Sequence, residues 1–62
     1  MAAHLRPAHQ PTCARCGKRA TVVLHNTSNA PISEYCLRCG NQKLKEFCEK
    51  YPDEGPFQRY TP

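Results

Sequence analysis

Apolar positions in the second half of the chain recur with helical spacing. Between residues 37 and 51 they follow one another at i, i+7, i+10, i+11 and i+14, which places them on one face of a helix. Pro52 cannot continue a helix and disfavours helical geometry in the preceding residue, so we expect the helix to end at Tyr51. The apolar face consists of Leu37, Leu44, Phe47, Cys48 and Tyr51.

A strand pattern precedes this helix. Residues 19–25 are rich in β-branched side chains and alternate between two faces, as expected of a strand with one buried side. A loop rich in Asn, Ser, Thr and Pro follows at residues 26–31, and residues 32–35 predict a returning strand. The predicted core is therefore a β-hairpin followed by a helix, a small α+β fold.

The two ends of the chain differ from this module. Residues 1–12 contain two prolines and few apolar groups, and we interpret them as a flexible leader. Residues 52–62 form a Pro-rich tail whose composition argues against regular structure. The tail still carries Phe57 and Tyr60, and we expect both rings to be sheltered, either against Leu44 and Phe47 or in a partner's groove. The folded module is predicted to span residues 13–51.

Composition shows that such a module needs additional stabilisation. The chain has 62 residues, of which 39% are apolar, and it has no Trp, so its core is small. Five cysteines offer either disulfides or metal binding. The N-terminal segment has no apolar signal-peptide region and the cysteine count is odd, so we expect a reduced, cytoplasmic protein. No apolar run approaches the ~20 residues that span a bilayer, and no membrane role is expected.

The cysteine spacing indicates a metal site. Cys13-x-x-Cys16 and Cys36-x-x-Cys39 are separated by nineteen residues, a spacing typical of four-sulfur zinc sites. One structural Zn²⁺ would contribute on the order of 10–16 kcal/mol to folding, which the small core cannot supply. Four thiolates leave no coordination position for a catalytic water, so we expect neither an enzyme nor a small-molecule substrate.

Other roles for the cysteines fit the sequence less well. A redox Cys-x-x-Cys motif requires a βαβ context that the pattern does not contain. Cys48 lies on the apolar helical face and is interpreted as a small buried group. His25 is expected to be exposed at a strand end, where it is the nearest alternative ligand.

The order of thiol knuckle, hairpin, and a second thiol pair that opens a helix predicts a treble-clef zinc finger. In such a knuckle Gly17 supplies the backbone freedom that turns amide groups towards the sulfurs. The alternative is a zinc ribbon, in which the chain after Cys39 would continue into a third strand.

Two segments carry a resemblance to known families. Residues 13–22 and 34–39 are similar to small bacterial treble-clef modules, in particular the zinc-binding part of the activator of protein-arginine kinase. That resemblance covers residues 13–39 and implies the zinc scaffold, not the kinase-activating role. Residues 36–40 before a helix also resemble the second half of a GATA-type DNA-binding finger, which again implies the scaffold.

Two functions follow from the remaining residues. The formal charge is +4; four thiolates and one divalent ion would change it by −4 and +2, which leaves about +2. The first hypothesis is binding of DNA or RNA phosphates. Its residues surround the knuckles and the helix start: Arg15, Lys18, Arg19, Arg38 and Lys43. The alternative is a protein-interaction module that uses the helix face and three aromatic anchors, Tyr51, Phe57 and Tyr60.

Overall fold

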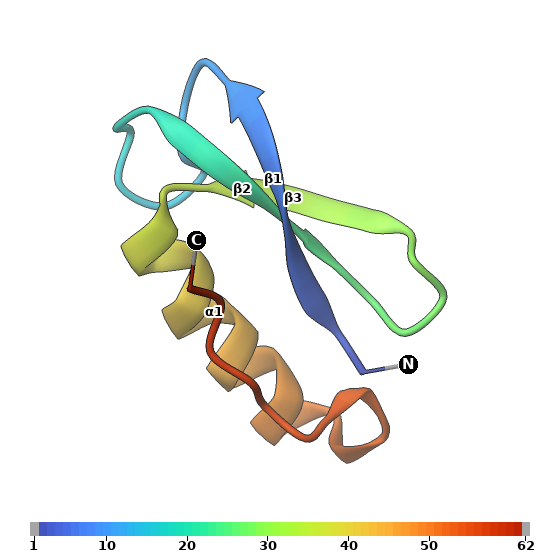
Figure 1. Cartoon of the computed structure of the whole chain (residues 1–62). Coiled ribbons are helices and arrows are strands. Elements are labelled where there is room, and N and C mark those ends of the chain that lie inside the picture. Colours follow the sequence, from blue (N-terminus) through green and yellow to red (C-terminus); the bar gives the residue numbers. More distant parts are fainter. Residues whose placement is uncertain (1, 62) are drawn as a thin grey trace.

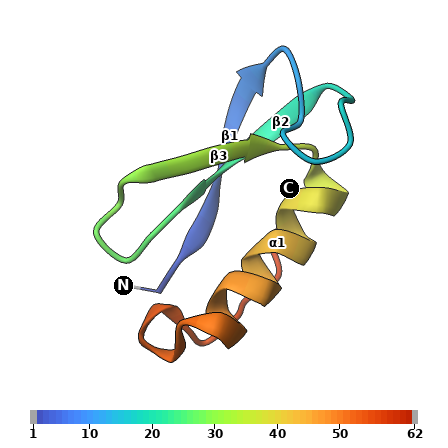
Figure 2. The same cartoon turned by 180° about the vertical axis from the view of Figure 1, so that it is seen from behind.

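The computed structural model describes residues 2–61 and contains one sheet and one long helix. Three antiparallel strands in the order β1-β2-β3 form the sheet, and α1 lies across one of its faces (Figures 1 and 2). A single turn of 3₁₀ helix, η1, follows α1 directly. The elements are β1 (His4–Gln10), β2 (Ala20–His25), β3 (Pro31–Tyr35), α1 (Leu37–Lys50) and η1 (Pro52–Glu54). The predicted α+β class is confirmed.

The central strand follows the predicted alternation. Ala20, Val22 and Leu24 are buried beneath α1, whereas Thr21 on the opposite face is exposed. β3 pairs with β2 through a hairpin whose loop is closed by Asn26, because the Asn26 side-chain oxygen accepts N–H bonds from Ser28 and Ala30 at 2.9 and 3.0 Å. The hairpin predicted from residues 19–35 is therefore present.

The helix also agrees with its predicted bounds. It ends at Lys50, one residue before the predicted end, since Tyr51 is followed by Pro52. Leu44 and Cys48 are buried and Phe47 is partly buried, but Tyr51 lies beyond the helix with 45% of its surface exposed. No helix within residues 2–61 has the length and apolar content needed to cross a membrane.

The N-terminal segment differs from the expected flexible leader. Residues 4–10 form β1, which pairs with β2 and sets Leu5 opposite Leu24. Leu5 and Ala3 are 5% and 4% exposed, so this strand supplies part of the core. The physical reason is that a two-stranded hairpin covers too little of an apolar helix face to be stable. Pro7 obscured the pattern, but proline is tolerated in an edge strand such as β1.

The C-terminal tail folds back onto the module. Glu54 accepts an N–H bond from Ala3 at its carbonyl (2.7 Å) and one from Thr27 at its carboxylate (2.8 Å). Farther along, the Asn41 side chain accepts from the Tyr60 N–H at 2.7 Å and donates to the Tyr60 carbonyl at 3.0 Å. Tyr60 packs against the core, as expected, whereas the chain itself leaves Phe57 36% exposed.

A glycine lets the helix approach the sheet. A Cβ atom on Gly40 would lie 2.7 Å from Val22 Cγ2 and 3.2 Å from Leu5 Cδ1. Both neighbours are buried, and Val22 is stiff because it is β-branched. Gly40 follows Cys39 directly, so this contact also sets how far the second thiol pair lies from the sheet.

We therefore expect Gly40→Val to destabilise the protein by about 2 to 3 kcal/mol through overpacking, and Glu49→Val, on the exposed side of the same helix, to change stability by less than about 1 kcal/mol. Denaturant unfolding of both variants at one fixed metal concentration measures the difference. Equal stability of the two variants would show that the helix does not depend on this close contact.

Candidate metal centre

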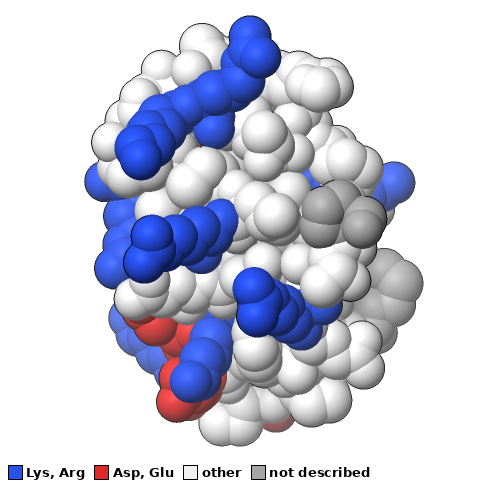
Figure 3. Space-filling view, turned by 60° about the vertical axis from the view of Figure 1, so that its left-hand side comes forward, with Lys and Arg blue, Asp and Glu red and all other residues white. Residues whose placement is uncertain are grey.

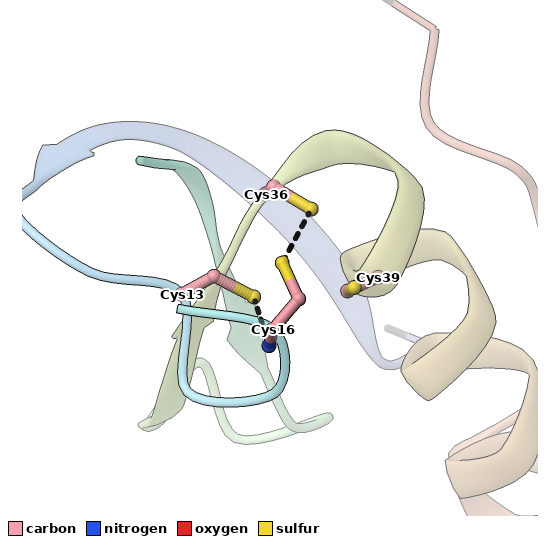
Figure 4. Close-up of side chains that lie close together, drawn as sticks. All are labelled: Cys13, Cys16, Cys36 and Cys39. Carbon is pink, nitrogen blue, oxygen red and sulfur yellow. Dashed lines mark hydrogen bonds between the residues drawn. The ribbon is translucent and has the colours of Figure 1, made fainter. Parts of the chain in front are cut away.

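Four thiols converge at one end of the sheet. Cys13 and Cys16 lie in the loop between β1 and β2, Cys36 lies between β3 and α1, and Cys39 lies in the first turn of α1 (Figure 4). Their Sγ atoms are all within 4.8 Å of one another, and those of Cys16 and Cys36 are 3.7 Å apart. The structure thus brings together all four predicted ligands.

Local backbone contacts shape the first thiol pair. Gly17 has a φ of 81°, a left-handed conformation that glycine adopts without steric cost, and its N–H donates to the Cys13 carbonyl at 3.1 Å. The backbone freedom predicted for Gly17 is thus used, but the amides that reach Cys13 Sγ belong to Arg15 and Cys16. A second bond, from the Ala14 N–H to the Glu34 carbonyl at 2.9 Å, joins this loop to the end of β3. The first pair is thereby held beside Cys36.

Backbone amides stabilise two of the sulfurs as thiolates. Burial by itself raises the pKa of Cys13, but N–H groups of Cys16, Cys36 and Arg15 outweigh it and lower this pKa to about 6. The amides of Arg15 and Cys16 lie 3.4 and 3.5 Å from Cys13 Sγ. The pKa of Cys36 is lowered chiefly by the N–H of Cys39, in the first turn of α1, as expected of a helix N-terminus.

The fourth thiol shows why this cluster suits a cation. The neighbouring Cys36 side chain, together with burial, raises the pKa of Cys39 to about 12. Four sulfurs this close cannot all be anionic without a compensating positive charge. A divalent ion at their centre would supply that charge and would favour the deprotonated form of all four.

The sulfur geometry fits one tetrahedral ion. Zn–S bonds of about 2.3 Å place the sulfurs of a regular tetrahedron about 3.8 Å apart. The Sγ atoms of Cys16 and Cys36 are 3.7 Å apart, close to such an edge, and no pair among the four is farther apart than 4.8 Å. All five cysteines of the described chain are free, so no disulfide competes for these thiols. The cluster can hold one metal ion.

The remaining candidate ligands lie outside the cluster. Cys48 is buried, and its thiol donates to the Glu54 carbonyl at 3.5 Å. Burial and the nearby Glu54 charge raise the pKa of Cys48, so it is a neutral packing group, as predicted. His25 is only partly exposed, contrary to expectation, because its ring stacks on that of His4 with centroids 5.5 Å apart.

Three of the five predicted nucleic-acid residues gather beside the thiols. Arg15, Lys18 and Arg38 line a hollow of about 480 Å³ together with the exposed face of the thiol cluster. Figure 3 shows Lys and Arg side chains spread over this side of the molecule, with acidic side chains near its lower edge. Arg19 is exposed but does not line the hollow.

Lys43, the fifth predicted nucleic-acid-binding residue, does not line this hollow. The Lys43 ammonium lies 3.6 Å from a Glu46 oxygen, and its side chain lines a groove between β3 and α1. In its place Gln42 lines the hollow. The sequence carried a signal for Gln42, because Arg38 and Gln42 are i and i+4 on one helix and share a face. Because Gln42 is uncharged, it was not among the basic residues predicted to bind phosphate.

Comparison of the chain with protein-family models, curated proteins and solved structures finds no match. The similarities to the arginine-kinase activator and to the GATA-type finger therefore stay predictions. The function has to be argued from the site.

Serine substitutions distinguish ligand from packing cysteines. Cys36→Ser removes one ligand, and we expect less than about a tenth of the normal metal content together with loss of cooperative unfolding. Cys48→Ser makes the same chemical change outside the cluster and removes no ligand, so full metal content and cooperative unfolding are expected. Elemental analysis and circular dichroism on both variants provide the readout. Normal metal content in Cys36→Ser would contradict the assigned ligand set.

Proposed function

We propose that this protein is a structural zinc module of the treble-clef type that binds nucleic acid through the basic hollow beside its metal site. The thiol knuckle, the hairpin and a helix that starts at the second thiol pair support this class. A zinc ribbon fits less well, because Cys39 continues into a helix of fourteen residues. β1 and the folded-back tail would be additions to the minimal finger.

Zinc is the ion that the donor set favours. Four thiolates in a tetrahedral arrangement select Zn²⁺ or iron over hard cations such as Mg²⁺ and Ca²⁺. The spacing of two Cys-x-x-Cys pairs and the small core are typical of domains that fold around structural zinc. A site closed by four sulfurs leaves no position for substrate, and we place the protein among non-catalytic modules. Five reduced thiols favour a cytoplasmic setting.

The observation that best supports nucleic-acid binding is that three basic side chains line one hollow. Arg15, Lys18 and Arg38 come from two segments far apart in sequence, and none of the residues that line the hollow within the described chain is acidic. Such a surface attracts phosphate groups, and Arg can contact two phosphate oxygens at once. Gln42 adds a donor and an acceptor that could contact sugar or base.

Charge segregation along the chain supports the same conclusion. All five acidic residues lie at or after Glu34, whereas Arg15, Lys18 and Arg19 precede it. The knuckle loop therefore has no acidic residue that would neutralise its cations. With only about three phosphate contacts available, we expect modest affinity that falls strongly with salt.

Protein interaction is the second candidate function. Tyr60 is used within the chain, so two of the three proposed anchors, Tyr51 and Phe57, remain exposed. Tyr51 lines the groove between β3 and α1, which gives this candidate a specific surface.

Salt dependence tests nucleic-acid binding. We expect the logarithm of the association constant to fall with log salt with a slope of about −2 to −3, from three contacts at −0.7 to −0.9 each. Fluorescence anisotropy with a labelled single strand and the matching duplex, using the metal-loaded chain, measures the slope. Arg38→Ala should reduce the slope by about 1.

Lys45→Ala is the matched control, since Lys45 is an exposed cation on the same helix that does not line the hollow. It should leave the slope nearly unchanged. Equal losses in both variants, or no binding at low salt, would refute the proposed surface.

A further inference from the structure

A groove between β3 and α1 is the second concave surface of interest. It has a volume of about 310 Å³, and buried Leu24 and Tyr35 lie among its lining residues. Its exposed apolar residues are Ile32 and Tyr51, with 43% and 45% of their surface accessible. Within residues 2–61, only Phe57 joins these two as an exposed large apolar residue. Two of these three exposed large apolar residues thus line the same groove.

The groove is open because only one side of α1 is covered. The tail runs along the helix on the side away from β3, where Asn41 holds the backbone of Tyr60 (Figures 1 and 2). On the β3 side, the ring of Phe47 packs against Tyr51 with centroids 5.0 Å apart, and both line the groove. An apolar surface of this kind is typical of an interaction site.

Addition of a partner strand to the sheet is disfavoured at this groove. β3 is an edge strand of five residues, but its Glu34 carbonyl already accepts the N–H of Ala14. At its other end Pro31 has no N–H to donate. An occupant must therefore bind chiefly by side-chain packing rather than as an extra strand.

The charges around the groove fit a surface that pairs with itself. Lys43 and Lys50 lie on the rim together with Glu46, so both signs occur within two helical turns, and Glu46 already pairs with Lys43 of its own chain at 3.6 Å. The Lys50 ammonium lies over the Tyr51 ring, 5.4 Å from its centroid. An interface related by a two-fold axis brings the same patch of both copies together, and a rim with both signs can then pair cation with anion.

We propose that this groove is the interface through which two copies of the chain associate. In the dimer Ile32 and Tyr51 of each copy pack against the groove of the other, and Lys50 of one copy faces Glu46 of the other. The groove and the basic hollow share no lining residue, so each dimer would present two free hollows. The dimer therefore does not depend on the proposed nucleic-acid binding.

The size of the molecule indicates a weak dimer. A standard interface buries about 800 Å² per partner, which is roughly a fifth of the 4270 Å² accessible surface of this chain. The groove occupies part of one face of a molecule that measures 30 × 19 × 17 Å. Only two exposed large apolar residues, Ile32 and Tyr51, supply the apolar contacts of such an interface, so association should be weak and depend on concentration.

Sedimentation equilibrium of the metal-loaded chain tests the proposal. The weight-average mass should rise with concentration from one chain towards two. Ile32→Glu should weaken association by roughly tenfold or more, which corresponds to about 1.4 kcal/mol. Thr21→Glu is the matched control, because it places the same charge at an exposed strand residue outside the groove, and it should leave association unchanged.

Charge reversal tests the pairing itself. Lys50→Glu and Glu46→Lys should each weaken association, and the double variant should restore it, as expected when the two positions meet across a two-fold axis. A monomer at every soluble concentration would overturn the proposal and leave the groove to a different partner. Equal effects of Ile32→Glu and Thr21→Glu would place the interface elsewhere and would also overturn it.

Discussion

The convergence of four thiols at one end of the sheet is the constraint around which this fold is arranged. An ion bound by all four would tie together the β1–β2 loop, the end of β3 and the first turn of α1, three segments that the small core alone would hold only weakly. Because such an ion requires all four sulfurs within a few ångströms, it would fix where α1 begins and how the hairpin closes. The amides that donate to Cys13 and Cys36 prepare two of the thiols for this role.

Contacts at both ends of α1 fix how the helix and the tail pack against the sheet. Gly40 brings α1 against Val22 and Leu5 immediately after the last ligand, so coordination and core packing meet within two residues. At the opposite end of the helix, Glu54 joins the tail to Ala3 and to the hairpin loop. These bonds extend the structure beyond the minimal finger without a large apolar core.

The features that could be predicted are those that depend on residues close together in the sequence. The thiol spacing, the helical apolar face and the alternation around Val22 are local patterns, and the structure confirms all three. β1 was missed because it contributes a single deeply buried side chain, Leu5, two residues before Pro7. The tethers made by Asn41 and Glu54 join residues far apart in sequence, and polar side chains carry no periodic signal for such contacts.

Surface function was harder to predict than the scaffold. A list of basic residues could not show that Arg15, Lys18 and Arg38 converge, or that Lys43 pairs with Glu46 instead. The predicted aromatic anchors also differ in their surroundings, because Tyr60 packs against the core while Tyr51 is exposed. Where side chains meet depends on how the fold is arranged around the thiol cluster, so the proposal that a bound ion stabilises the fold is central.

Chelation followed by NMR tests that claim most directly. Amide spectra of the ¹⁵N-labelled chain would be recorded with zinc, after its removal by a chelator, and after its return. The account predicts that dispersed resonances, including those of Leu5, Val22 and Leu44, collapse on removal and recover when zinc is restored. A spectrum that stays dispersed without metal would contradict it, because the core would then suffice to fold the chain.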